Sequence, residues 1–127
     1  MIFDTDVMIW AFRGNPSALD LIDSTPSRSI SAVTYMELLQ GVRDKNEMRQ
    51  MKRFLSQLEF TTIPTTANIS SRAISIMEAC ALKSAIGPCD ALIFATACET
   101  GDTLISGNDK HFKEVPMLDA VRFRPHV

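Results

Sequence analysis

Short apolar runs alternate along the chain with longer stretches in which apolar residues recur every three or four positions. The short runs are typical of buried strands, and the longer pattern indicates helices with one apolar face. The short runs predict strands at 1–4, 28–31, 60–64, 103–106 and 120–123. The helical spacing predicts helices at 7–10, 16–23, 32–40, 45–58, 66–84, 89–100 and 109–113.

Proline and glycine support several of these helix boundaries. Pro16 and Pro88 stand where two helices begin, and proline is favoured there because the N–H that it lacks would have no partner in a first turn. Gly41 follows the third helix, where a glycine commonly ends one. The helix at 45–58 has a methionine-rich apolar face, which we interpret as core, with a subunit contact as the alternative.

Strands that alternate with helices predict an α/β fold. Right-handed crossovers make such strands parallel and place helices on both faces of the sheet. The sequence therefore predicts a single domain over residues 1–127, a three-layer α/β/α sandwich around a mostly parallel five-stranded sheet. In sheets of this kind, the functional crevice lies beyond the carboxyl ends of the strands.

Composition narrows the class of protein that carries this fold. A hydrophobic fraction of 46% and a charged fraction of 22% are typical of a folded domain and argue against disorder. No apolar run approaches the roughly 20 residues of a membrane span, and no secretion signal is recognisable, so a cytoplasmic location is expected. The three cysteines match no zinc-site spacing and are expected to be buried free thiols.

The net charge of −2 argues against a protein that holds nucleic acid by bulk electrostatics alone. A local basic patch is nevertheless present within one predicted helix and the turn before it: Arg43, Lys45, Arg49, Lys52 and Arg53. A solvated helix face is the simpler interpretation of most of these side chains.

Four acidic residues are predicted to lie at the crevice. Asp4 ends the first strand, and Glu37 lies early in the helix that follows the second strand. Asp90 lies in the first turn of the helix that begins at Pro88, and Asp109 follows the fourth strand. Each of these positions is compatible with the same edge of the sheet.

Each acid also has a purely structural explanation. An aspartate at position 4 or 6, like the Asn-Asp pair at 108–109, can cap the helix that follows it. Thr34 and Glu37 have the spacing of a capping box, and Asp90 complements the dipole of its helix. For any one acid alone, the structural explanation is at least as good as a catalytic one.

Taken together, the four acids indicate a metal centre. Carboxylates around one crevice repel one another and raise their own pKa values unless a cation lies among them. Oxygen ligands without histidine or cysteine suit Mg²⁺ or Mn²⁺. A centre of this kind hydrolyses phosphate esters by activating a water molecule and neutralising the charge that develops on the phosphate.

Four segments, in this order and spacing, resemble the motifs of the PIN-domain nucleases: Phe3-Asp4-Thr5-Asp6-Val7, then residues 31–41, 88–97 and 104–112. Within that superfamily, the chain is similar to the VapC toxins of toxin–antitoxin pairs, from residue 2 to about residue 112. The resemblance implies a PIN-like α/β/α fold and an endoribonuclease that depends on Mg²⁺ or Mn²⁺. It also implies an RNA substrate, a cognate VapB-like antitoxin and a homodimer.

The resemblance carries residue roles as well. By position, the acids of the family fall on Asp4, Glu37, Asp90 and Asp109, with Asp4 and Asp90 as metal ligands and the other two bound directly or through water. Candidates for an outer shell are Thr5, Asp6, Ser106 and Asn108. Asp6 departs from the family, which more often has Asn or Ser there, and the last motif leaves open whether Asn108 or Asp109 is the fourth site residue.

Two other interpretations compete with the nuclease. Asp4-Thr5-Asp6 after an apolar strand also resembles the haloacid dehalogenase phosphatases, in which the first aspartate is a nucleophile and the second a general acid. That interpretation needs a lysine and a further acidic motif after Ser106, and it leaves Glu37 and Asp90 unused. A PIN-like interaction module without catalysis would be expected to have lost some of the four acids, all of which are present.

Overall fold

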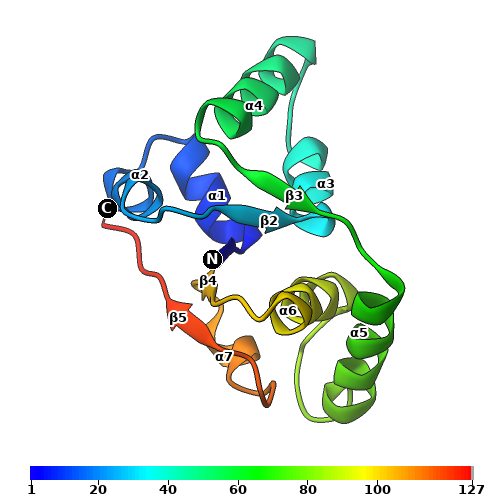
Figure 1. Ribbon diagram of the computed structural model, residues 1–127. Coiled ribbons are helices and arrows are strands. Elements are labelled where there is room, and N and C mark those ends of the chain that lie inside the picture. The colour runs from blue at the N-terminus through cyan, green and yellow to red at the C-terminus, as the bar shows by residue number, and fades with distance from the viewer. Residues whose placement is uncertain (127) are drawn as a thin grey trace.

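The sheet of the computed structural model, which describes residues 1–126, is five-stranded and entirely parallel (Figure 1). Its strands are short: β1 (Ile2–Phe3), β2 (Ser29–Ser31), β3 (Thr61–Ile63), β4 (Leu104–Ser106) and β5 (Ala120–Arg122). Their order across the sheet is β3-β2-β1-β4-β5, so β1 lies at the centre and β4 beside it. The predicted α/β class, the strand positions and the parallel sheet are confirmed.

Seven helices connect and flank the strands: α1 (Thr5–Phe12), α2 (Pro16–Asp23), α3 (Ala32–Gln40), α4 (Lys45–Gln57), α5 (Ala67–Cys80), α6 (Pro88–Thr100) and α7 (Asp109–Phe112), among residues 1–126. Proline begins α2 and α6, as predicted. Short polar side chains cap others: Asp44 Oδ1 accepts a hydrogen bond from the Glu47 N–H at the start of α4, and Thr66 Oγ1 accepts one from the Ile69 N–H at the start of α5.

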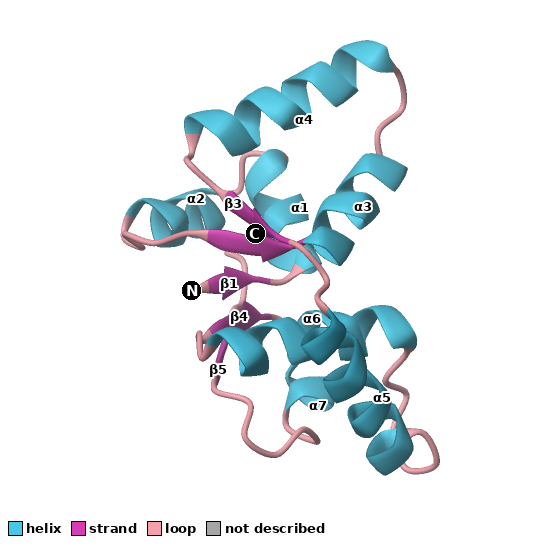
Figure 2. Cartoon of the chain, turned by 45° about the vertical axis from the view of Figure 1, so that its right-hand side comes forward, coloured by secondary structure: helices cyan, strands magenta, loops and turns pink. Residues whose placement is uncertain are grey.

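Helices cover both faces of the sheet (Figure 2), and each face buries a separate core. Successive residues of a strand point to opposite faces. Phe3 and Ile105 therefore pack with α1, α2 and α4, whereas Ile2 and Leu104 pack with α5 and α6. Helix α6 is buried along most of its length, as its apolar composition predicted.

The end of α5 differs from the prediction, because this helix stops at Cys80 rather than continuing to residue 84. Beyond Cys80 the next positions on the buried stripe are Lys83 and Ser84, neither of which is an apolar residue. The chain turns instead, Ser84 Oγ accepts a hydrogen bond from the Ile86 N–H, and the Ile86 side chain enters the core.

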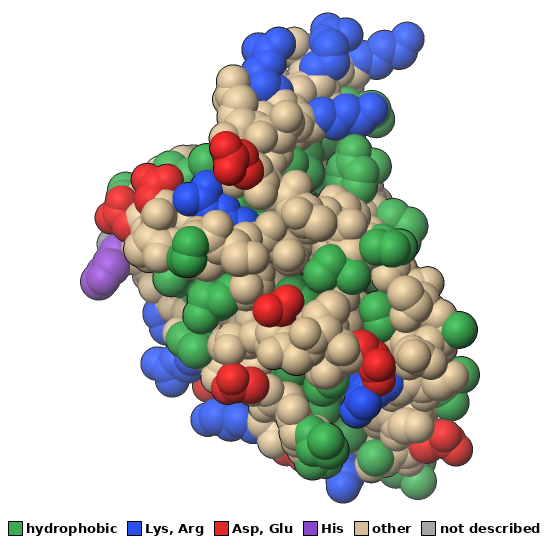
Figure 3. Space-filling model, viewed as in Figure 1, with side chains coloured by type: hydrophobic (Ala, Val, Ile, Leu, Met, Phe, Trp, Pro, Cys, Tyr) green, Lys and Arg blue, Asp and Glu red, His purple; other side chains and the backbone are tan. Residues whose placement is uncertain are grey.

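The cysteine prediction is correct only in part. All three thiols are free, but Cys80 alone is buried, while Cys98 is half-buried and Cys89 is exposed. The basic side chains of α4 are exposed and gather on the part of the molecule that this helix forms (Figure 3). Among residues 1–126, no helix has the length and apolar character needed to cross a membrane.

Candidate functional site

A pocket of about 480 Å³ opens at the carboxyl ends of β1 and β4. Parallel pairing of these strands brings their ends together, so residues far apart in sequence meet at one edge of the sheet. The pocket is lined by Asp4, Thr5, Asp6, Ile9, Glu37, Asp90, Gly107 and Asn108. Asp4, Glu37 and Asp90, three of the four predicted acids, are therefore brought together.

Asp4 is the most enclosed of the acids, with only 5% of the residue exposed. Its Oδ1 accepts a hydrogen bond from the Thr5 N–H at 2.8 Å, and Asp4 is the N-cap of α1. Its Oδ2 accepts a hydrogen bond at 2.7 Å from the hydroxyl of Ser106, the last residue of the neighbouring strand β4. Asp4 thus caps a helix and lines the pocket at the same time, so the two explanations weighed for it are compatible.

Burial raises the pKa of Asp4 from 3.8 to about 7, and the nearby carboxylates of Asp6 and Asp90 add to this effect. The hydrogen bonds from Ser106 and the Thr5 N–H act in the opposite direction but do not outweigh it. A carboxylate whose charged form is disfavoured by burial and by like charges gains stability from a nearby cation.

Asp6 lines the pocket but is committed to the backbone. Its Oδ1 accepts from the Val7 N–H at 2.8 Å and its Oδ2 from the Gly107 N–H at 2.9 Å. A Cβ on Gly107 would lie 2.5 Å from Asp6 Oδ2, so a glycine is required for this close approach. Burial raises the pKa of Asp6 as well, although these backbone hydrogen bonds oppose the shift.

Glu37 is directed into the pocket by contacts that replace the predicted capping box. Helix α3 is capped by Ser31, whose Oγ accepts from the Thr34 N–H at 3.0 Å, so the capping explanation of Glu37 is wrong. Glu37 Oε1 accepts instead from the Thr5 hydroxyl at 2.7 Å. Thr5, an expected outer-shell residue, therefore positions a carboxylate.

Asp90 lies in the first turn of α6 and is half-buried. Its Oδ2 is 3.4 Å from His111 Nδ1, and the same nitrogen is 2.8 Å from Asn108 Nδ2. His111 was not among the candidate residues predicted from the sequence. Its spacing of three residues from Asn108 places both on one side of α7 and was the available signal.

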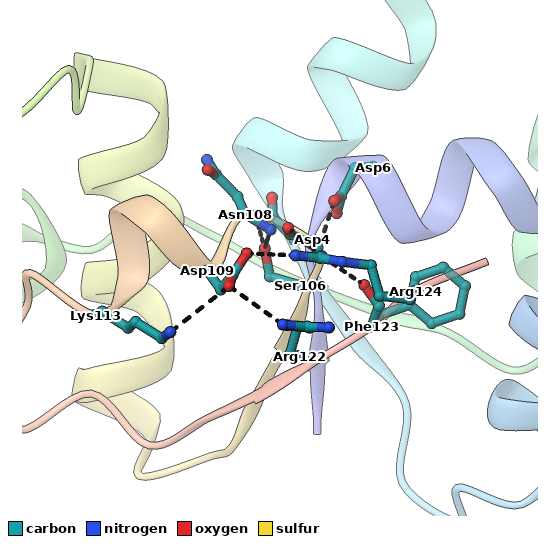
Figure 4. A network of polar contacts seen from close by, with 10 residues as sticks. Asp4, Asp6, Ser106, Asn108, Asp109, Lys113, Arg122, Phe123 and Arg124 are labelled. Atoms are coloured by element: carbon teal, nitrogen blue, oxygen red, sulfur yellow. Dashed lines mark hydrogen bonds and ion pairs between the residues drawn. The ribbon is translucent and has the colours of Figure 1, made fainter.

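Asp109 does not line the pocket. Its carboxylate accepts a hydrogen bond from Arg124 Nη2 at 2.6 Å, and Lys113 Nζ and Arg122 Nη1 each lie 3.7 Å away (Figure 4). The hydrogen bond from Arg124 holds the pKa of Asp109 below its usual value. At the last motif, the residue that lines the pocket is Asn108, whose N–H donates to Ser106 Oγ at 2.9 Å.

The donors at the pocket fit a hard divalent cation. They are carboxylate and amide oxygens, and the one buried carboxylate has a raised pKa that a cation would relieve. Within residues 1–126, no three acidic, histidine or cysteine side chains converge closely enough to form a complete ligand set. Mg²⁺ suits such a site because it is often bound by one or two carboxylates and keeps several water molecules.

Comparisons with known proteins bear on the family and the fold. The family described as the PIN domain matches residues 1–118. A comparison with curated proteins gives no match. Among solved structures, a toxin–antitoxin complex from Klebsiella pneumoniae contains a chain that is 28% identical, with a TM-score of 0.74 and coverage of 94% of each chain.

Two further solved structures share the fold. VapBC2 from Rickettsia felis, bound to a DNA fragment from its promoter, has 24% identity and a TM-score of 0.82, covering 98% of this chain and 100% of that chain. FitAcB from Neisseria gonorrhoeae has 19% identity and a TM-score of 0.77, covering 95% and 96%. At these identities, the likeness establishes the fold alone.

The raised pKa of Asp4 predicts how stability depends on pH. Between pH 3.8 and about 7 the folded state holds a proton that the unfolded state has lost, so the free energy of unfolding falls as pH rises. An asparagine in place of Asp4 cannot ionise and keeps a similar shape. In EDTA at pH 8, Asp4→Asn should therefore be more stable than the wild type by on the order of 4 kcal/mol, because the pKa is raised from 3.8 to about 7 and each pKa unit corresponds to about 1.4 kcal/mol.

Chemical denaturation from pH 4 to pH 8 measures this difference, which should shrink towards pH 4. The exposed Asp20, changed to Asn, is the matched control and should leave the pH dependence as it is. A wild type that is as stable as Asp4→Asn at pH 8 would show that the burial of Asp4 carries no electrostatic cost.

Proposed function

Because the chain belongs to the PIN-domain family, we propose that it is a cytoplasmic, metal-dependent endoribonuclease and the toxin of a toxin–antitoxin pair. The observation that carries the proposal is the enclosed carboxylate of Asp4, which shares a pocket with Glu37 and Asp90. Such a cluster is costly for a stable fold and useful for holding a cation against a phosphodiester.

Asp4 and Asp90 would hold Mg²⁺ or Mn²⁺, with Glu37 acting directly or through water. When bound, the cation supplies a more acidic water molecule and neutralises charge on the phosphate. The hydrogen bond from Thr5 orients the Glu37 carboxylate, which can then accept a proton from the attacking water or hold that water in line. Ser106 fixes Asp4, and His111 lies against Asp90 on the side of α7.

The geometry of Asp6 does not favour the phosphatase alternative. A general acid at position 6 would need to offer a proton to a leaving group. Both oxygens of Asp6 instead accept backbone hydrogen bonds, from Val7 and Gly107. We assign Asp6 the role of holding the loop after β4. Its side chain lines the pocket but takes no part in the proposed reaction.

A second cavity, of about 500 Å³, supports the proposal of a VapB-like antitoxin. It lies between α1, α3 and α4 and shares Ile9 and Glu37 with the acidic pocket. Phe12, Leu38 and Met51 give it apolar walls. An amphipathic segment of the antitoxin would dock there in helix-in-groove fashion, and an arginine at its end could pair with the carboxylates. The homodimer implied by the resemblance stays a prediction.

Metal binding should be visible without any substrate. Millimolar Mn²⁺ should raise the melting temperature of the wild type, because a ligand at about one hundred times its Kd adds about 2.7 kcal/mol to the free energy of unfolding. Asp4→Asn and Asp90→Asn should lose this shift in differential scanning fluorimetry. Asp109→Asn should keep it, because the Asp109 carboxylate faces Arg124. Loss of the shift in Asp109→Asn would instead make Asp109 the fourth ligand.

RNA cleavage is the direct test of the reaction. The purified chain should cut single-stranded or looped RNA internally in Mg²⁺ or Mn²⁺ and should lose this activity in EDTA. Asp90→Asn should lower kcat by a factor of about 100 or more, since it removes a charge that acts on the transition state. Full activity in Asp90→Asn, combined with loss of phosphate monoester hydrolysis in Asp6→Ala, would favour the phosphatase.

The toxin role predicts an effect on growth. Expression of the wild-type chain alone should arrest growth, whereas the folded Asp90→Asn variant at the same level should not. Co-expression with the small gene next to it should restore growth. Normal growth at good soluble yield of the wild type would reject the toxin role and leave the nuclease chemistry to be judged by the cleavage assay.

A further inference from the structure

Three cationic side chains converge on the single carboxylate of Asp109: Lys113, Arg122 and Arg124 (Figure 4). Three positive charges around one negative charge leave an excess of two, in a chain whose net charge is −2. Exposed ion pairs contribute little to stability, so the stability of the fold gives little reason to gather three cations on one carboxylate.

The end of the sheet explains how the two arginines come to lie together. Arg122 pairs in register with Ser106, the last residue of β4, and the Phe123 N–H donates to the Ser106 carbonyl at 2.8 Å. Phe123 turns its side chain into the core. Because successive side chains of an extended strand alternate, Arg122 and Arg124 share the opposite side, where Asp109 lies.

Gly107 joins this cluster to the acidic pocket. Its N–H donates to Asp6 inside the pocket, and its carbonyl accepts from Arg124 Nη1 at 2.7 Å on the other side. Gly107 therefore contacts the acidic pocket through its N–H and the cationic cluster through its carbonyl, so the cluster lies next to the proposed reaction centre. A strand of RNA with its cleaved phosphate in the pocket would place a neighbouring phosphate at the cluster.

The charged groups remain accessible to such a phosphate. The side chains of Lys113, Arg122 and Arg124 are 68%, 56% and 48% exposed, whereas that of Asp109 is only 15% exposed beneath them. Asp109 thus orders the cations while leaving their outer N–H groups to solvent. Arginine in particular presents several N–H donors in a fixed planar arrangement that matches phosphate oxygens.

We propose that Lys113, Arg122 and Arg124, ordered by Asp109, form a phosphate-binding cluster that holds the RNA backbone next to the cleaved bond. The proposal rests on the nuclease function proposed above. It gives Asp109 the role of a positioning residue that acts through its cations, and it makes the edge beside β5 the path along which the substrate leaves the pocket.

Binding of uncleaved RNA tests the cluster. A labelled single-stranded RNA of about twelve nucleotides is titrated in EDTA and followed by fluorescence anisotropy at several salt concentrations. Lys113→Gln/Arg122→Gln should weaken binding about fivefold or more and lower the slope of log K against log salt by roughly 1.4, at about 0.7 per lost phosphate contact. Arg124 is left in place because its hydrogen bond to Gly107 supports the pocket.

The matched control is Lys52→Gln/Arg53→Gln, which removes two exposed cations from α4. It should change RNA binding by less than about twofold. Cations that do not contact the RNA affect its binding only through long-range electrostatics, which salt screens. Asp109→Asn should weaken binding less than the test variant does, because all three cations remain but the carboxylate that orders them is lost. Equal losses in the test and control variants, or an unchanged affinity in the test variant, would overturn the proposal.

Steady-state kinetics separate this inference from the nuclease assignment. If the wild type cuts RNA, Lys113→Gln/Arg122→Gln should raise KM with little change in kcat, the pattern of lost ground-state binding. If the wild type binds RNA through the cluster but never cuts it, the nuclease function fails and the cluster stands. A variant that binds RNA normally but loses its antitoxin would assign the cluster to an acidic protein segment and reject the RNA path.

Discussion

The burial of the Asp4 carboxylate is the constraint from which the rest of the site follows. Asp4 receives hydrogen bonds from the backbone of α1 and from Ser106 on β4, so it ties the central strand to its neighbour and starts a helix. The same enclosure makes its charge unfavourable and leaves the pocket in need of a cation. One side chain therefore links the packing of the sheet to the proposed chemistry, and the fold gives up stability at the position where the proposed function requires a negative charge.

Much of the fold could be predicted from the sequence, because its signals are local. Pro16 and Pro88 mark helix starts, and alternating burial in residues such as Ile2 and Phe3 sets the faces of the sheet. The end of α5 could not be predicted from periodicity, because it depends on Ile86 reaching the core. The convergence of Asp4, Glu37 and Asp90 on one pocket could be predicted because parallel strands deliver their carboxyl ends to one edge of the sheet.

The last motif, at residues 104–112, shows which contacts cannot be predicted from the local sequence. Asn108 is held at the pocket by contacts within its own segment, with Ser106 and His111, but the partner that holds Asp109 away from the pocket lies outside that segment. That partner is Arg124, which lies fifteen residues along the chain and reaches Asp109 through the pairing of β5 with β4. The alternation of Arg122, Phe123 and Arg124 is visible in the sequence, but it identifies the partners of Asp109 only once the pairing of β5 with β4 is known.

Gly107 has a consequence for how sequences of this kind can diverge. A Cβ there would meet Asp6 Oδ2 at 2.5 Å and the Phe123 carbonyl at 3.3 Å. A shorter side chain at position 6 would remove the tighter of these contacts, so the cost of alanine at 107 depends on a residue that lies 101 positions earlier. The two positions are therefore epistatic. Alanine at position 107 is therefore less harmful after position 6 has become shorter than before, and the order in which the two changes arise decides which evolutionary paths stay open to this chain.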